Sequence, residues 1–97
     1  MEKLRHALGF GGILSPDAIE VVLERWRVQR LKPGEEFLPY GDVADRIGWL
    51  AKGAMRIYQY GNDGSEATEY FLRPGQFMVD LESYYSGQPA ECGIRAV

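Results

Sequence analysis

The sequence predicts a mainly β fold, an incomplete double-stranded β-helix or jelly roll with one short α-helix near its N-terminus. Two observations predict the β architecture. Glycines recur after residue 30 at intervals of about one strand and one turn. Short segments rich in β-branched and aromatic residues lie between them. A third observation, one stretch of helical periodicity before these segments, predicts the helix. Regular short strands separated by turn residues are typical of sandwiches and barrels.

The length and composition restrict the class of protein. The chain has 97 residues, of which 45% are apolar and 26% charged, as expected for one small globular domain. A net charge of −3 argues against a nucleic-acid-binding surface on this chain. The single cysteine, Cys92, has no partner for an internal disulfide, which fits a reducing cytoplasm. No apolar run is long enough to span a membrane, so we predict a cytoplasmic protein without a membrane partner.

The chain is expected to divide near residue 15. Residues 1–14 are predicted to be a loose N-terminal segment, because several glycines interrupt its short helical pattern. Residues 15–97 are predicted to form a β-roll domain that includes the helix. His6 lies in the loose segment, and the sequence offers it no second metal ligand nearby.

Ser15, Pro16 and Asp17 mark the start of the predicted helix. The serine caps free amides, the proline suits the first helical position, and the aspartate complements the positive end of the helix. The helix is expected to end near Trp26 or Arg27. Within this helix, apolar residues recur at helical spacing and give it one apolar face: Ile19, Val22, Leu23 and Trp26.

Short strands are expected in the remainder of the chain. The clearest hairpin turn is Gly61-Asn62-Asp63-Gly64, because these residues tolerate the left-handed backbone conformation. The predicted strands cover residues 36–39, 46–51, 54–60, 66–72, 77–79 and 95–97. The glycines expected at corners of the roll are Gly34, Gly41, Gly53, Gly64, Gly75 and Gly87.

An ordered series of motifs accompanies these glycines: Leu31-Lys32-Pro33-Gly34-Glu35, Tyr40-Gly41-Asp42, Ile47 to Gly53, Asp63-Gly64, Tyr70-Phe71-Leu72 and Pro74-Gly75-Gln76-Phe77. Over roughly residues 15–97 this series resembles the cyclic-nucleotide-binding domain of the CRP/FNR family of bacterial regulators. The resemblance implies an eight-stranded double-sheet roll. In that family a final strand, a long dimerising helix and a DNA-reading helix-turn-helix follow, and this sequence contains none of them. We therefore expect a homodimer that contacts DNA only through a C-terminal domain absent here.

The stretch from Gly75 to Val97 resembles the family's phosphate-binding cassette. A strand leads into a short helix-compatible segment, Leu81 to Tyr85, which is followed by a Ser-Gly-Gln-Pro break and another strand. In the family, amides at the start of this helix face a phosphate, an arginine pairs with it, and a glutamate accepts a bond from the ribose hydroxyl. The candidate ligand pocket implied by the resemblance consists of Val79, Asp80, Leu81, Glu82, Tyr84, Ala90, Glu91 and Cys92.

Several of these positions differ from the family pattern. Val79 stands where the family has glycine, and Leu81 stands at its leucine. Asp80 stands at the glutamate, Ala90 at the arginine and Glu91 at the serine or threonine. Ala90 has no charge to pair with a phosphate, and Glu91 repels one.

The cassette carries its own negative charges. Asp80 is well placed to cap the short helix, and Glu82 to lie in its first turn. The protein's own carboxylates are thus expected to occupy the anion site. Cyclic AMP is therefore a disfavoured ligand, and no other cofactor is predicted. Arg73 and Arg95 are alternative partners for an anion, although we expect both to lie in solvent at strand ends.

The two tyrosines of the cassette have alternative interpretations. In one interpretation, Tyr84 and Tyr85 stack on a base. In the alternative interpretation, one of the two tyrosines belongs to the core. Cys92 is interpreted as a buried apolar residue. No metal-ligand spacing, P-loop or catalytic triad is present, and one histidine does not support a cupin-like enzyme.

We therefore predict that the chain is no enzyme. The first hypothesis is the ligand-sensing domain of a CRP/FNR-like transcription regulator, with a degenerate cassette and a small-molecule effector. The alternative is a ligand-free β-roll module used for dimerisation.

Overall fold

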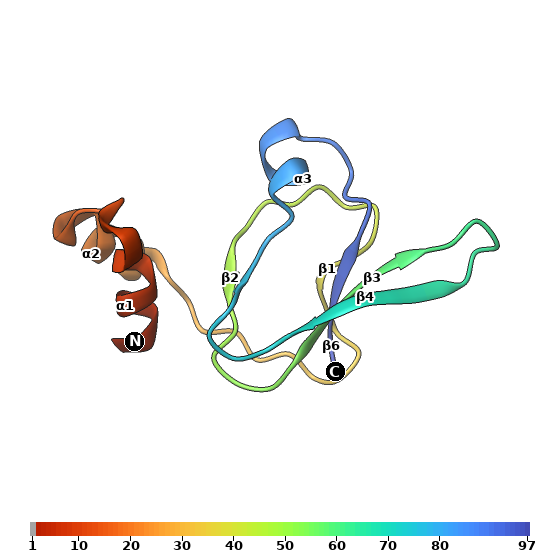
Figure 1. Ribbon diagram of the computed structural model, residues 1–97, viewed down its shortest axis with the longest axis horizontal. Coiled ribbons are helices and arrows are strands. Elements are labelled where there is room, and N and C mark those ends of the chain that lie inside the picture. The colour runs from red at the N-terminus through yellow and green to blue at the C-terminus, as the bar shows by residue number, and fades with distance from the viewer. Residues whose placement is uncertain (1) are drawn as a thin grey trace. The chain divides into compact units, whose positions relative to one another are not determined.

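The computed structural model describes residues 2–97 (Figure 1). It divides into two compact units, one that ends at Arg30 and one that runs from Leu31 to Val97. The expected boundary at residue 15 is therefore displaced. The helix predicted from Ser15 onward belongs with the N-terminal residues and not with the β-roll.

The N-terminal unit contains two α-helices, α1 (Glu2–Gly9) and α2 (Pro16–Arg25), joined by a 3₁₀ turn, η1 (Phe10–Gly12). Over the described residues 2–12, the expectation of a loose segment is wrong, as is that of a single N-terminal helix. The glycines end α1 instead of preventing it. Leu4 of α1 and Ile19 of α2 are buried, and the two helices contact each other, which supplies the apolar burial that a helix this short needs.

Helix α2 begins as its sequence predicts. The Ser15 side chain accepts a hydrogen bond from the Ala18 amide at 3.1 Å, and Pro16 is the first helical residue. The helix ends at Arg25, close to the predicted position. The predicted apolar face is confirmed, because Ile19 is buried and Val22, Leu23 and Trp26 are half-buried.

The second unit is an antiparallel β structure, so the mainly β prediction is confirmed. Its strands are β1 (Glu36–Leu38), β2 (Gly48–Trp49), β3 (Met55–Tyr60), β4 (Glu66–Leu72), β5 (Phe77–Met78) and β6 (Gly93–Ala96). One sheet has the order β1-β6-β3-β4, and the other pairs β2 with β5. A short helix, α3 (Leu81–Ser86), lies between β5 and β6 (Figure 1).

The corner glycines behave as predicted. All six adopt the positive φ that residues with a side chain rarely adopt: Gly34, Gly41, Gly53, Gly64, Gly75 and Gly87. The order of turns along the sequence therefore corresponds to the order of corners in the fold.

The four-stranded sheet has an apolar face and a charged face. Ile57 of β3 lies opposite Ile94 of β6, and both are buried in the core. The neighbouring pair, Arg56 and Arg95, projects from the other face because side chains alternate along a strand. The core consists of Leu38, Ala44, Leu50, Met55, Ile57, Leu72, Met78, Ala90, Ile94 and Ala96.

An ionic network covers the charged face. The Arg95 guanidinium donates to Glu36 at 2.7 Å and to Glu66 at 2.8 Å, and Arg56 also pairs with Glu66. The Tyr58 hydroxyl donates to Glu36 at 2.8 Å. Arg95, expected in solvent, is thus a cross-strand partner that connects β1, β6 and β4.

The Tyr58 ring lies against the backbone of Gly93. A Cβ atom at that position would overlap the ring, so the strand admits only glycine there without displacing Tyr58.

A register shift interrupts the pairing of β3 with β4. Ile57 lies opposite Tyr70 and the next residue, Tyr58, lies opposite Thr68. Glu69 is therefore an extra residue without a partner on β3, as in a β-bulge. The alternation of side chains changes at this point, and Glu69 lies on the same side of β4 as Tyr70, where both line a pocket.

Candidate ligand site

Helix α3 begins with a capping interaction. The Asp80 carboxylate accepts a hydrogen bond from the Ser83 amide at 3.1 Å, and the Tyr84 amide donates to the Asp80 carbonyl at 2.9 Å. Glu82 lies in the first turn. The structure therefore confirms the predicted cap, and the chain's own carboxylate occupies an amide at the start of this helix.

The cassette is fixed to the rest of the roll through Ser83, which is 3% exposed. Its hydroxyl accepts a hydrogen bond from the Ala44 amide at 2.8 Å and donates to the Gln88 carbonyl at 2.6 Å. At its end, α3 passes through Gly87, where a φ of 74° reverses the chain. These bonds hold the helix and the loop after it in one arrangement.

Ala90, at the position where the family has arginine, is a core residue that is 3% exposed. Its backbone carbonyl accepts from the Gly41 amide at 3.1 Å, and its amide donates to the Asp42 carbonyl at 2.8 Å. A long cationic side chain at this position would have to leave the core to reach solvent.

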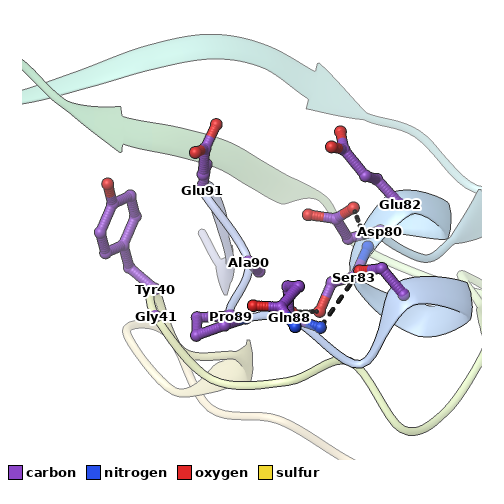
Figure 2. Close-up of a pocket in the computed structure, with 10 residues that line it drawn as sticks. Tyr40, Gly41, Asp80, Glu82, Ser83, Gln88, Pro89, Ala90 and Glu91 are labelled. Atoms are coloured by element: carbon purple, nitrogen blue, oxygen red, sulfur yellow. Dashed lines mark hydrogen bonds between the residues drawn. The ribbon is translucent and has the colours of Figure 1, made fainter.

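Two pockets border the cassette. The first, which we call the loop pocket, has a volume of about 590 Å³. In Figure 2, Tyr40 and Glu91 lie on one side of it, and Asp80 and Glu82 of the α3 region lie on the other. The pocket is lined by Tyr40, Gly41, Asp80, Glu82, Ser83, Ser86, Gln88, Pro89, Ala90 and Glu91.

The second, which we call the sheet pocket, has a volume of about 340 Å³ and adjoins the apolar side of β3, β4 and β6. Asp80 and Glu91 line both pockets. The sheet pocket is lined by Ile57, Gln59, Glu69, Tyr70, Val79, Asp80, Leu81, Glu91, Cys92 and Ile94.

The lining of both pockets is acidic. Glu69, Asp80 and Glu91 line the sheet pocket, and Glu82 adds a carboxylate to the loop pocket. No lysine or arginine is among the described residues that line either pocket. Neither pocket therefore offers a cation that would pair with a phosphate.

The Cys92 thiol is a hydrogen-bond donor in the sheet pocket, with its Sγ 3.4 Å from Oδ2 of Asp80. Burial raises the pKa of Cys92 to about 12, and the hydrogen bond to Asp80 and the charges of Asp80 and Glu69 contribute to the rise. The thiol is therefore protonated at neutral pH, which does not suit a nucleophile or a redox sensor. Cys92 is half-buried, packs against the core, and also borders the pocket.

The structure brings five of the eight predicted site residues together in the sheet pocket: Val79, Asp80, Leu81, Glu91 and Cys92. Glu82 and Ala90 line the loop pocket only. Tyr84 lines neither of these two pockets, and its ring contacts Tyr85 at 5.5 Å between centroids. Both tyrosines are exposed, by 39% and 81%, so the expectation that one of them belongs to the core is wrong.

Sequence reasoning missed several lining residues, among them Tyr40, Gln59, Glu69 and Tyr70. Glu69 is the most informative, because it is not among the predicted site residues. It lines the pocket because of the bulge in β4, and a bulge inserts a residue without changing the composition of the strand.

Among residues 2–97, no three histidine, cysteine, aspartate or glutamate side chains are grouped so as to hold a metal ion. Within the same range, no helix has the length and apolar character that crossing a membrane requires.

The fold and the pockets define a small antiparallel β-roll with a helical cassette beside its sheet. The family model for the cyclic nucleotide-binding domain matches residues 28–97, which is most of the chain. The chain therefore belongs to the cyclic nucleotide-binding domain family, a family of binding domains. The family match begins close to Leu31, where the second unit starts. No curated protein matches the sequence.

Solved structures with the same fold include several regulators. The catabolite activator protein of Thermus thermophilus is 22% identical, with a TM-score of 0.75 over 94% of this chain and 41% of its own. The sensor domain of the transcriptional regulator DNR from Pseudomonas aeruginosa is 19% identical, with a TM-score of 0.79 over 100% of this chain and 69% of its own.

A third structure is the regulatory subunit of a cAMP-independent protein kinase A from Trypanosoma cruzi, bound to guanosine. It is 17% identical, with a TM-score of 0.80 over 98% of this chain and 33% of its own. The chain thus spans less than half of the catabolite activator protein and about a third of this kinase subunit. At these identities the similarity establishes the fold.

Proposed function

We propose that this chain is the ligand-sensing domain of a CRP/FNR-like bacterial transcription regulator, and that its cassette does not bind cAMP in the usual way. The observation that carries the proposal is the acidic lining of both pockets, where Asp80 also caps the helix that faces a phosphate in the family. The family match and the fold shared with two transcription regulators support the sensing role.

The charge of the cassette determines what it binds. A phosphate beside Asp80, Glu82 and Glu91 would lose a charge-assisted pair and gain like charges, at a cost of several kcal/mol by the usual magnitudes of such contacts. Each 1.4 kcal/mol lowers affinity about tenfold. Micromolar affinity for a cyclic nucleotide is therefore lost.

In the whole regulator, the domain is proposed to act in the cytoplasm as a homodimer. A small effector would bias the dimer between two states and so alter DNA binding by a C-terminal domain that is not part of this sequence. Light scattering at high micromolar concentration tests the dimer, and a monomeric mass under these conditions contradicts it.

Calorimetric titration with cAMP and cGMP tests the proposed ligand preference. We expect no binding tighter than about 10 μM, which corresponds to a free energy of roughly −7 kcal/mol. The variant Glu91→Arg places a cation at the rim of both pockets and is expected to gain affinity for cAMP. The matched control is Glu24→Arg, which makes the same charge change on an exposed position of α2. Wild-type binding tighter than 10 μM would refute the proposal.

The alternative is a ligand-free dimerisation module. The buried Ala90 and the occupied amide at the start of α3 favour it, because Ala90 replaces the arginine that pairs with the phosphate in the family and Asp80 occupies an amide that would face it. The two functions differ in one observable: a sensing domain binds some small molecule in the sheet pocket, and a dimerisation module binds none.

A further inference from the structure

We infer that the sheet pocket binds an organic cation with an apolar body, of the size and chemistry of an arylalkylamine. This inference rests on the proposed sensing function and names the class of its ligand. It depends on three properties of the pocket: the apolar part of its wall, its unpaired carboxylates and the position of Glu69.

Part of the wall of the pocket is apolar. Ile57 and Ile94 come from the buried side of the sheet, and Val79 and Leu81 come from the cassette. The Tyr70 ring is 55% exposed at the pocket and has no ring partner among the described residues. An apolar or aromatic ligand body would cover this surface and gain the free energy of apolar burial.

The polar groups of the pocket favour a positive charge. The side chains of Glu69 and Glu91 form no hydrogen bond or ion pair with another residue in the described range. The Asp80 carboxylate, in contrast, accepts hydrogen bonds from Ser83 and Cys92. An ammonium group beside Glu69 and Glu91 supplies the missing counter-charge, and the Tyr70 face adds an attraction for a cation. A carboxylate or phosphate at the same place would be repelled.

The bulge in β4 positions one of these carboxylates. With regular pairing, Glu69 and Tyr70 would project to opposite sides of the strand. The register shift between Ile57 and Tyr58 places both side chains at the pocket, so a carboxylate and an aromatic ring adjoin each other. Carboxylate and ring together are the groups that recognise an alkylammonium ion.

A titration of the full chain with tyramine, followed by ¹H–¹⁵N NMR, tests the inference. Two matched compounds differ from tyramine only in the charged end: 4-ethylphenol has none, and 3-(4-hydroxyphenyl)propionate has a carboxylate. We expect tyramine to shift the amide signals of Glu69, Glu91 and Cys92, and to bind about fivefold or more tightly than 4-ethylphenol. The propionate is expected to bind more weakly than both.

The variants Glu69→Gln and Glu91→Gln keep the shape of the pocket and remove one charge each. Each is expected to weaken tyramine binding about threefold to fivefold, as for partly exposed charge pairs. The control Glu24→Gln, on α2 and outside the sheet pocket, is expected to leave the affinity unchanged. Circular dichroism on each variant shows whether its fold is retained.

Three results would overturn the inference. Equal affinity for tyramine and 4-ethylphenol would show that the carboxylates do not select charge. If cAMP shifts the amide signals of Glu69, Glu91 and Cys92 and tyramine does not, the domain senses a different ligand and the inference is wrong. No shift at these residues from any compound, up to 10 mM in the experiment, would refute the inference and favour the ligand-free module over the proposed function.

Discussion

Two groups of carboxylates lie on opposite sides of the same sheet and differ in how they are neutralised. On the charged face, Glu36 and Glu66 accept hydrogen bonds from Arg95. At the sheet pocket, Glu69 and Glu91 have no such partner among the described residues. The difference shows that this fold pairs its acidic side chains where they support strand pairing. The unpaired acids have no comparable structural role, which is why we relate them to a ligand.

The contrast is sharpest within β4, where Glu66 and Glu69 are three residues apart. The guanidinium of Arg56 hydrogen-bonds Glu66 and, with Arg95, holds the pKa of Glu66 below its usual value. Conversely, the carboxylate of Glu36 raises the pKa of Arg95. One strand thus has a paired and an unpaired glutamate, and the two respond differently to the same substitution.

The largest effect is expected from removing the central cation of the charged face. Arg95→Met should lower the free energy of unfolding by about 1–2 kcal/mol, since it leaves Glu36 without a cation and Glu66 with Arg56 alone in a partly exposed network. Oε2 of Glu36 is already buried without a hydrogen-bond partner among the described residues. Urea unfolding followed by circular dichroism measures the change.

The control for this substitution is Arg73→Met. Arg73 is exposed and follows the end of β4, outside the network. It should change the free energy of unfolding by no more than about 0.5 kcal/mol, the usual range for surface positions. An equal loss in both variants would show that the network on the charged face is not what stabilises the sheet.

The sequence predicted the positions of strands and corners because each depends on local chemistry. A positive φ favours glycine, and all six predicted corner glycines adopt one. Likewise, Asp80 was recognised as a helix cap because capping depends on a residue and the amide three positions later. The strand expected over residues 46–51 is shorter in the structure, where β2 covers Gly48–Trp49.

The contacts that depend on distant residues were not predictable. Nothing local distinguishes Arg95 from an exposed strand arginine, because its partner Glu36 is 59 positions away. Helix α1 is not predictable from its own residues, since its stability comes from packing on α2. Glu69 is absent from the predicted site because its position at the pocket results from how β4 pairs with β3. The pocket's acidic character was therefore predictable only in part, from Asp80, Glu82 and Glu91.

An intermediate effect is expected at alkaline pH from Cys92. Its pKa is raised from an ordinary value of 9.0 to about 12 in the folded protein. The unfolded chain therefore loses this proton first, and stability present below pH 9 is lost as the pH rises toward 12. Relative to Cys92→Ala, the wild type should lose about 1 kcal/mol between pH 8 and pH 10.

Urea midpoints of the two proteins across this pH range measure the difference, and the comparison cancels the titration of tyrosines and lysines common to both. Parallel pH profiles would show that neither burial nor the charges of Asp80 and Glu69 raise the pKa of the thiol. The same result would weaken the view that the sheet pocket is a negatively charged environment.

The smallest effect is expected from the two glutamates of β4, which we compare by the same substitution. Glu66→Gln should lower stability, because it weakens the bonds that Arg56 and Arg95 donate. Glu69→Gln should leave stability unchanged or raise it by about 0.3 kcal/mol, since it relieves repulsion from Asp80 and Glu91 and breaks no bond. Thermal unfolding at low ionic strength, repeated in high salt, measures both, and salt should reduce the gain from Glu69→Gln because it screens the repulsion. A loss of stability in Glu69→Gln equal to that in Glu66→Gln would mean that Glu69 has a structural partner, and its availability to a cationic ligand would then be refuted.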